Sequence, residues 1–201
     1  MNYQNAKFIK SATAIEHYPT DQGAEVAFAG RSNAGKSSAL NTLTCQKSLA
    51  RVSKTPGRTQ LINFFALDQT EAYRLVDLPG YGFAKVSINV KKDWQKMIET
   101  YLSGRESLKG IILLVDIRHD LKEFDKVMIQ YAIDIQKPLH VLLTKADKLS
   151  NNQQANALRQ TKKFLSSLSN SEMCSTQTFS ALKNTGTAEL IAKMDEWLVI
   201  Q

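Results

Sequence analysis

The residues best suited to chemistry lie between Gly30 and Ser38, where the sequence reads GRSNAGKSS. They match GxxxxGK[ST], a loop whose backbone N–H groups surround phosphate oxygens. Its glycines allow the backbone to turn successive N–H groups toward one centre. Its lysine can reach the β- and γ-phosphates of a nucleotide, and the following hydroxyl can ligate Mg²⁺. We therefore predict a phosphate site formed by Gly30, Arg31, Ser32, Asn33, Ala34, Gly35, Lys36, Ser37 and Ser38.

A second candidate is Asp77-Leu78-Pro79-Gly80, which follows an apolar segment. A carboxylate at the end of a strand can hold Mg²⁺ through water, and a glycine amide can bond a γ-phosphate. Upstream, Thr59 is the best candidate for a second direct Mg²⁺ ligand, with Gly57 beside it in the nucleotide site. Without the other motifs, Asp77–Gly80 could equally be a simple turn, and Thr59 a solvent-exposed threonine of a loop. We assign catalytic roles to Lys36, Thr59 and Gly80, direct Mg²⁺ binding to Ser37 and Thr59, and water-mediated Mg²⁺ binding to Asp77.

Two further segments indicate which base is bound. In Thr144-Lys145-Ala146-Asp147, the Asp147 carboxylate can accept hydrogen bonds from N1–H and the exocyclic amine of guanine. Adenine offers neither donor, and a buried carboxylate left unpaired can discriminate by ~10⁴-fold. The Lys145 stem can lie flat along the base, and a backbone N–H at Ala181 can read the guanine O6. The predicted guanine site comprises Thr144, Lys145, Asp147, Ser180, Ala181 and Leu182.

Apolar segments alternate with helical ones, which is typical of a mainly parallel sheet covered on both faces. We expect an α/β fold with a single P-loop domain: a mostly parallel six-stranded sheet, one antiparallel edge strand and helices on both faces. The strands are expected at 25–29, 61–67, 72–76, 110–115, 139–143 and 174–179, with a further candidate at 7–12. The helices are expected at 35–47, 90–102, 121–135, 153–168 and in the last residues before Leu198. Each candidate motif follows a strand, where ligands of open α/β sheets bind.

Composition is that of a globular domain: 201 residues, 43% apolar and 22% charged. We expect a cytoplasmic protein, because neither a signal peptide nor a long apolar segment is evident, and we take a monomer as the default. The net charge is +7, and no Asp or Glu occurs from Val26 to Leu67. A one-sign stretch is often only a solvated face, but here it contains the phosphate loop and favours a polyanionic partner.

Together the five motifs resemble those of the Ras-like GTPase superfamily. More narrowly, GRSNAGKSS, SKTPGRTQ, DLPGYGFA and TKADKL resemble the EngB (YihA/YsxC) family of bacterial ribosome-assembly GTPases, over roughly Lys7 to Leu198. The resemblance implies a G domain over residues 23–201, with residues 1–22 as an extension packed on or beside it. It also implies Mg²⁺-dependent hydrolysis of GTP to GDP and phosphate. The implied role is a nucleotide switch in assembly of the large ribosomal subunit, with ribosomal RNA and proteins as partners and no membrane; cell division would depend on it.

Four positions modify this expectation. Tyr81 stands where Ras-like proteins carry a glutamine that orients the attacking water, so we expect slow intrinsic hydrolysis. Thr144 replaces the commoner asparagine, which removes an amide near the base and the phosphate loop. In resembling GTPases, an asparagine placed like Asn33 can hold K⁺ beside the phosphates; otherwise it stabilises its own loop. Arg58 could act as a cis arginine finger or as a surface charge.

Several other functions remain open. An ATPase or nucleotide kinase on the same fold is disfavoured by Asp147 in its TKAD setting. An RNA-binding protein regulated by nucleotide, with negligible intrinsic GTPase activity, is the main alternative. A membrane-anchored signalling GTPase is disfavoured because lipidation motifs are lacking. In the leading hypothesis the segments near 48–60 and 79–88 change order between the GTP and GDP states.

Overall fold

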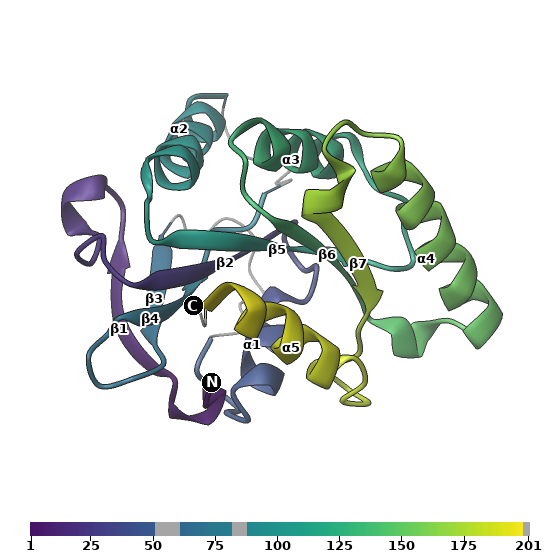
Figure 1. Cartoon of the computed structure of the whole chain (residues 1–201), viewed down its shortest axis with the longest axis horizontal. Helices are drawn as coiled ribbons and strands as arrows, with labels where there is room; N and C mark the ends of the chain where they lie inside the picture. Colours follow the sequence, from purple (N-terminus) through teal and green to yellow (C-terminus); the bar gives the residue numbers. More distant parts are fainter. Residues whose placement is uncertain (51–60, 82–87, 199–201) are drawn as a thin grey trace.

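One mixed sheet organises the protein (Figure 1). The computed structural model describes residues 1–50, 61–81 and 88–198, with the backbone alone for 88–95. Within these residues seven strands follow the order β1-β3-β4-β2-β5-β6-β7. Their bounds are β1 Lys7–Ala12, β2 Ala24–Gly30, β3 Ile62–Ala66, β4 Tyr73–Asp77, β5 Leu108–Asp116, β6 Leu139–Thr144 and β7 Cys174–Thr178. The helices are α1 Lys36–Leu43, α2 Ile88–Gly104, α3 Glu123–Asp134, α4 Asn151–Ser166 and α5 Thr187–Leu198, besides short 3₁₀ turns.

The predicted α/β class is confirmed, and two details of the sheet differ. Strands β4, β2, β5, β6 and β7 run parallel, whereas β3 is antiparallel to both β4 and β1. The sheet therefore has seven strands instead of six, and β1 replaces β3 at the edge. The sequence signal of β1 is weak because most of its side chains are exposed and its register shifts between Phe8 and Lys10.

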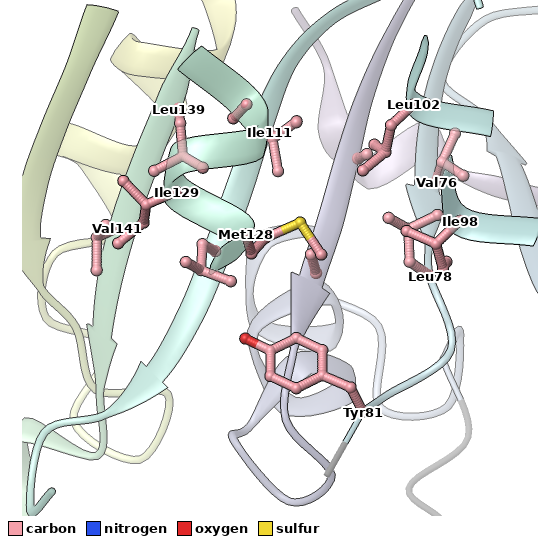
Figure 2. Close-up of a cluster of buried hydrophobic side chains, with 14 of the residues drawn as sticks. Val76, Leu78, Tyr81, Ile98, Leu102, Ile111, Met128, Ile129, Leu139 and Val141 are labelled. Atoms are coloured by element: carbon pink, nitrogen blue, oxygen red, sulfur yellow. The ribbon is translucent and has the colours of Figure 1, made fainter. Parts of the chain in front are cut away.

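Helices cover both faces of the sheet, as the alternation of segments predicts. Helices α2, α3 and α4 pack on one face and α1 and α5 on the other (Figure 1). Strand β2 is buried along its whole length, which explains its near-continuous apolar sequence. Figure 2 shows the α2/α3 side of the core, where Ile98 and Leu102 of α2 and Met128 of α3 face strand residues.

The last helix docks closely because the sheet leaves space for it. The expected last helix is confirmed as α5: Leu190, Met194 and Leu198 are buried, and Trp197 packs against the same cluster. A Cβ at Gly110 of β5 would lie 2.2 Å from a ring atom of Trp197. Glycine is thus needed at this position for the helix to reach the sheet.

The first residues of the chain contact the rest of the fold. Tyr3 is 3% exposed, and its hydroxyl donates to Asp195 of α5 at 2.7 Å. The Gln46 amide donates to the carbonyl of Ala6 at 2.8 Å. The division of the chain after residue 22 stays a prediction. Among the described helices, none is long and apolar enough to cross a bilayer.

A buried histidine in β6 should make stability depend on pH. Burial lowers the pKa of His140 from 6.5 to about 4, although Gln177 hydrogen-bonds its ring. The folded state therefore binds fewer protons than the unfolded chain between these values. Stability from this group is complete above pH ~6.5 and falls as the pH drops toward 4, by about 3 kcal/mol in all.

Urea unfolding at pH 7, 5.5 and 4 will measure this loss. Carboxylates also titrate in this window, so the wild type is compared with His140→Gln. Between pH 7 and 4 this variant should lose less unfolding free energy than the wild type, because it lacks the contribution of His140. His119→Gln, a change at an exposed histidine, should follow the wild type. Equal pH slopes for wild type and His140→Gln would contradict the assignment.

Candidate nucleotide-binding site

The predicted phosphate loop joins the end of β2 to the start of α1. Gly35 precedes the helix with φ 100°, a conformation that side chains with a Cβ rarely adopt. A Cβ on Gly30 would lie 2.8 Å from the carbonyl oxygen of Leu114. No side chain caps the start of α1, so its first N–H groups face outward for an anion. The loop thus has the backbone form that its sequence predicts.

The segment Asp77-Leu78-Pro79-Gly80 lies directly against the phosphate loop. Lys36 Nζ is 3.0 Å from Asp77 Oδ1, and their side chains are 12% and 13% exposed. The N–H of Ser32 donates to the carbonyl of Tyr81 at 2.9 Å. A Cβ on Gly80 would come within 3.2 Å of the Ser32 backbone. The structure therefore brings the predicted residues Lys36, Asp77 and Gly80 together.

Tyr81 is turned toward α3. Its side chain is 3% exposed, and its hydroxyl donates to Asp125 Oδ1 at 2.6 Å. Asp125 in turn accepts the N–H of Lys122 at 2.9 Å and so caps α3. Burial, followed by the Asp125 charge, raises the pKa of Tyr81 far above its usual value. In this arrangement the phenol links the second motif to α3, a partner that the sequence did not reveal.

The Thr144-Lys145-Ala146-Asp147 motif and the segment Ser180-Ala181-Leu182 meet beside the phosphate loop. Asp147 Oδ1 accepts the Ser180 hydroxyl at 2.6 Å, and this bond lowers the pKa of Asp147 and keeps it ionised. Ser180 also accepts the N–H of Lys183 at 3.1 Å, which fixes the hydroxyl. An open cleft of about 380 Å³ lies here, lined by Gly35, Ser38, Thr144, Lys145, Asp147, Lys148, Phe179, Ala181 and Leu182.

The predicted base site and the predicted phosphate site both border the phosphate loop. Gly35, which lines the cleft beside Asp147, directly precedes Lys36 in the sequence. Lys36 in turn contacts Asp77 on the phosphate side. A nucleotide held at Lys36 can therefore extend its base toward Asp147. Gly57, Arg58 and Thr59 lie outside the described residues.

Thr144 keeps the phosphate loop attached to the sheet. Its hydroxyl lies 2.5 Å from the carbonyl of Ala34 and 3.2 Å from that of Val115, and the residue is 2% exposed. One hydroxyl proton can serve only one of these acceptors at a time, and the shorter distance favours Ala34. The threonine thus lacks the amide of asparagine but still anchors the loop through a hydroxyl.

Thr144→Val should loosen this loop while preserving side-chain volume. We expect the unfolding free energy to fall by about 1–2 kcal/mol, because a buried carbonyl loses its donor. Release of GDP should become several-fold faster, because Ala34 is no longer anchored. Thr161→Val, which removes a hydroxyl that donates to the Ala157 carbonyl within α4, is the matched control and should affect stability alone. Stopped-flow release of fluorescent GDP separates the two effects; equal release from both variants would contradict the anchoring role.

Sequence reasoning missed Asp116 and Arg118, which lie beside this site. Asp116 Oδ2 is 2.8 Å from Lys145 Nζ and 2.6 Å from an Arg118 terminal nitrogen. The sequence did contain a signal for Asp116, because this residue ends the apolar segment of β5 in the same way that Asp77 ends β4. Polar residues in that position meet the ligand edge of a parallel sheet.

Comparisons with known proteins agree with this geometry. The family described as 50S ribosome-binding GTPase matches residues 25–145. The "Probable GTP-binding protein EngB" of Francisella tularensis subsp. tularensis (strain FSC 198) is 57% identical over 197 residues, which cover 98% of this chain and 99% of that protein. The protein of the same name from Francisella philomiragia subsp. philomiragia is also 57% identical, with the same coverage.

A solved structure extends the comparison to three dimensions. The crystal structure of a probable GTP-binding protein engB is similar to this chain with a TM-score of 0.68 and 25% sequence identity. The match covers 87% of this chain and 98% of that one. Sequence identity across nearly the full length, the family match and the arrangement of the phosphate loop lead to one assignment. The chain belongs to the EngB family of GTP-binding proteins, which is a P-loop GTPase family.

Proposed function

We propose that this protein hydrolyses GTP to GDP and phosphate and acts as a nucleotide switch in assembly of the large ribosomal subunit. The observation that carries the proposal is the placement of Lys36 with Asp77 and of Asp147 with Ser180 around one phosphate loop. Lys36 supplies positive charge to the phosphates, and Asp147 supplies two acceptors for guanine. An ionised Asp147 suits guanine and leaves adenine unpaired.

The residues present fit a Mg²⁺ ion. Asp77 Oδ1 is buried and, among the described residues, accepts no hydrogen bond, although it lies 3.0 Å from the Lys36 ammonium. With the Ser37 hydroxyl it offers hard oxygen donors, which Mg²⁺ prefers. Ser37 would bind the ion directly and Asp77 through water, with Thr59 as the further proposed ligand. When bound, the ion supplies positive charge to the β- and γ-phosphates.

The protein groups then hold the reacting phosphate. Lys36 stabilises negative charge on the β- and γ-phosphates, and the Gly80 amide donates to the γ-phosphate. Tyr81 lacks the amide that would orient the attacking water, and its hydroxyl donates to Asp125, so we expect a slow intrinsic rate. The γ-phosphate and Mg²⁺ would tether Gly80 and Thr59, so loss of the γ-phosphate would release both segments. Such a loss is the usual signal of a nucleotide switch.

Two titrations test the nucleotide part of the proposal. Fluorescent GTP should bind tightly and fluorescent ATP weakly, because Asp147 discriminates between the bases. Phosphate release should be measurable but slow, and we propose that K⁺ at Asn33 accelerates it over matched NaCl. Equal rates in KCl and NaCl would remove K⁺ from the mechanism. Binding without any phosphate release would instead favour a nucleotide-regulated RNA-binding protein, as the engaged Tyr81 allows.

The ribosomal part rests on the family description and on charge. The matching family is described as ribosome-binding, and residues 26–67 contain no Asp or Glu. Binding to ribosomal RNA through Lys and Arg releases counterions and weakens with salt. Cosedimentation with ribosomal subunits in GDP, GTP and a non-hydrolysable analogue should show large-subunit binding in one nucleotide state. Binding that ignores both nucleotide and KCl concentration would overturn this part.

A further inference from the structure

The ammonium group of Lys145 lies between two oxygens that belong to different parts of the fold. Nζ donates to the carbonyl of Asn33 in the phosphate loop at 2.8 Å. The same atom lies 2.8 Å from Asp116 Oδ2 at the end of β5. The backbone of Lys145 has φ 59°, a left-handed conformation that is uncommon for a side chain of this size. The lysine tip is therefore held by two oxygens from different segments.

Asp116 is itself held in one orientation. Arg118 approaches it with two side-chain nitrogens at 2.9 and 2.6 Å, and the Arg118 N–H donates to it at 3.1 Å. Burial alone would raise the pKa of Asp116, but hydrogen bonds from Arg118 and Lys145 outweigh it and lower the pKa. The carboxylate is 12% exposed and ionised at neutral pH. It thus presents a fixed negative charge to Lys145.

Lys145 also marks the boundary between two clefts. It lines the cleft that contains Asp147, and it lines a second cleft of about 260 Å³ on the Asp116 side of the phosphate loop. A free lysine side chain would sample many rotamers, and ordering it costs up to about 2 kcal/mol. Holding its tip before a ligand arrives removes this cost from binding.

We propose that Asp116 is a positioning residue for nucleotide binding: it fixes Lys145 so that the lysine stem borders the base cleft while its tip clamps the phosphate loop at Asn33. The proposal rests on the proposed guanine site at Lys145 and Asp147. Arg118 supports Asp116 from the solvent side, where its own side chain is 45% exposed. The stability contribution of such a partly exposed pair is small, so its main effect falls on the ligand.

The test measures release of fluorescent GDP from the full chain. Asp116→Ala should release GDP about tenfold faster, as for loss of one charge-assisted hydrogen bond. Asp116→Asn, which keeps an acceptor oxygen, should recover part of the wild-type rate. Asp120→Ala removes an exposed carboxylate from the same loop and is the matched control, with wild-type release expected. Thermal unfolding without nucleotide should differ little among the four proteins.

A double-variant cycle separates positioning from a merely structural role. In a Lys145→Ala background, Asp116→Ala should cause no further acceleration, because its effect acts through the lysine. If Asp116→Ala releases GDP like the wild type, or adds its full effect to Lys145→Ala, the positioning role is wrong. If wild-type protein binds ADP as well as GDP, the proposed guanine site fails and this inference fails with it. GDP preference with an unresponsive Asp116 would overturn the inference alone.

Discussion

Asp147→Asn is expected to lower the affinity for GDP by about 10³–10⁴-fold, the largest functional effect that we predict. The Asp147 carboxylate is ionised and oriented by the Ser180 hydroxyl at 2.6 Å. In the proposed site it accepts two hydrogen bonds from guanine. An amide keeps one acceptor and turns an N–H₂ group toward a guanine donor, so two donors face each other.

The fold should tolerate this change, since the amide oxygen can still accept from Ser180. Titration with fluorescent GDP measures the loss, and an unchanged thermal midpoint without nucleotide shows that folding is intact. Xanthosine diphosphate carries a carbonyl where guanine carries its amine, so it should bind the variant better than GDP does. Asp134→Asn, the same change at an exposed carboxylate of α3 that lines neither cleft, should leave GDP affinity within a few-fold. GDP affinity unchanged in Asp147→Asn would refute the predicted base contact.

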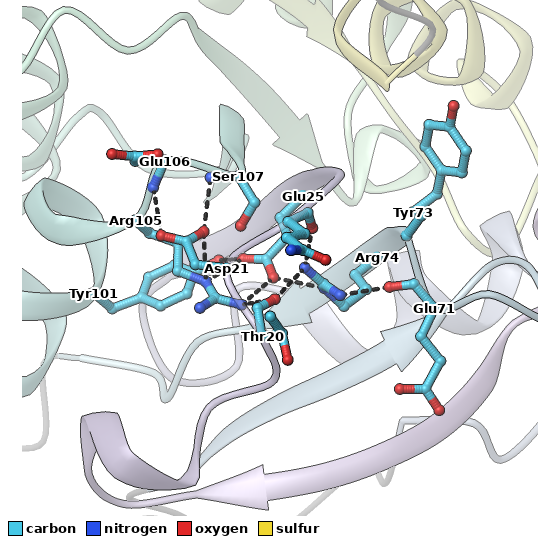
Figure 3. A network of polar contacts seen from close by, with 12 residues as sticks. Thr20, Asp21, Glu25, Glu71, Tyr73, Arg74, Tyr101, Arg105, Glu106 and Ser107 are labelled. Atoms are coloured by element: carbon cyan, nitrogen blue, oxygen red, sulfur yellow. Dashed lines mark hydrogen bonds and ion pairs between the residues drawn. The ribbon is translucent and has the colours of Figure 1, made fainter.

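Glu25→Gln is expected to lower the free energy of unfolding by about 3–5 kcal/mol, the largest stability effect. Glu25 is 0% exposed at the start of β2, and Figure 3 shows the network around it. Arg74 Nε lies 2.6 Å from one carboxylate oxygen, and a terminal nitrogen of Arg105 lies 2.7 Å from the same atom. Tyr101 donates to the other oxygen at 2.9 Å. Removing the charge leaves two buried guanidinium groups, and among the described residues Arg105 alone keeps a negative partner, Asp21 at 3.6 Å.

Urea unfolding measures this loss, with Glu106→Gln as the control because that exposed carboxylate lies beside the network. The control should change the unfolding free energy by less than about 0.5 kcal/mol. GDP affinity of folded Glu25→Gln should remain that of the wild type, because Glu25 lies at the opposite end of β2 from the phosphate loop. A loss of less than about 1 kcal/mol would show that water or rearrangement compensates the two arginines.

The sequence predicted most elements because their patterns are local. The apolar segments at 110–115 and 139–143 lie within β5 and β6, and the strands expected at 61–67 and 72–76 are the antiparallel pair β3 and β4. The expected first helix extended to Lys47, whereas α1 ends at Leu43. Cys45 with φ 54° ends the helical conformation there, and such a turn leaves little mark on composition.

The amino-acid sequence by itself determined the family motifs and the α/β class, because each motif spans a few residues and each helix or strand has a local pattern; the guanine preference of Asp147 stays a prediction. Only the tertiary structure decided which distant groups meet. It paired Asp116 with Lys145, Tyr81 with Asp125, and Glu25 with Arg74 and Arg105, and it added β1 as the outer strand. Ion pairs and hydrogen bonds between distant segments follow from chain geometry and burial, and neither periodicity nor local propensity records them.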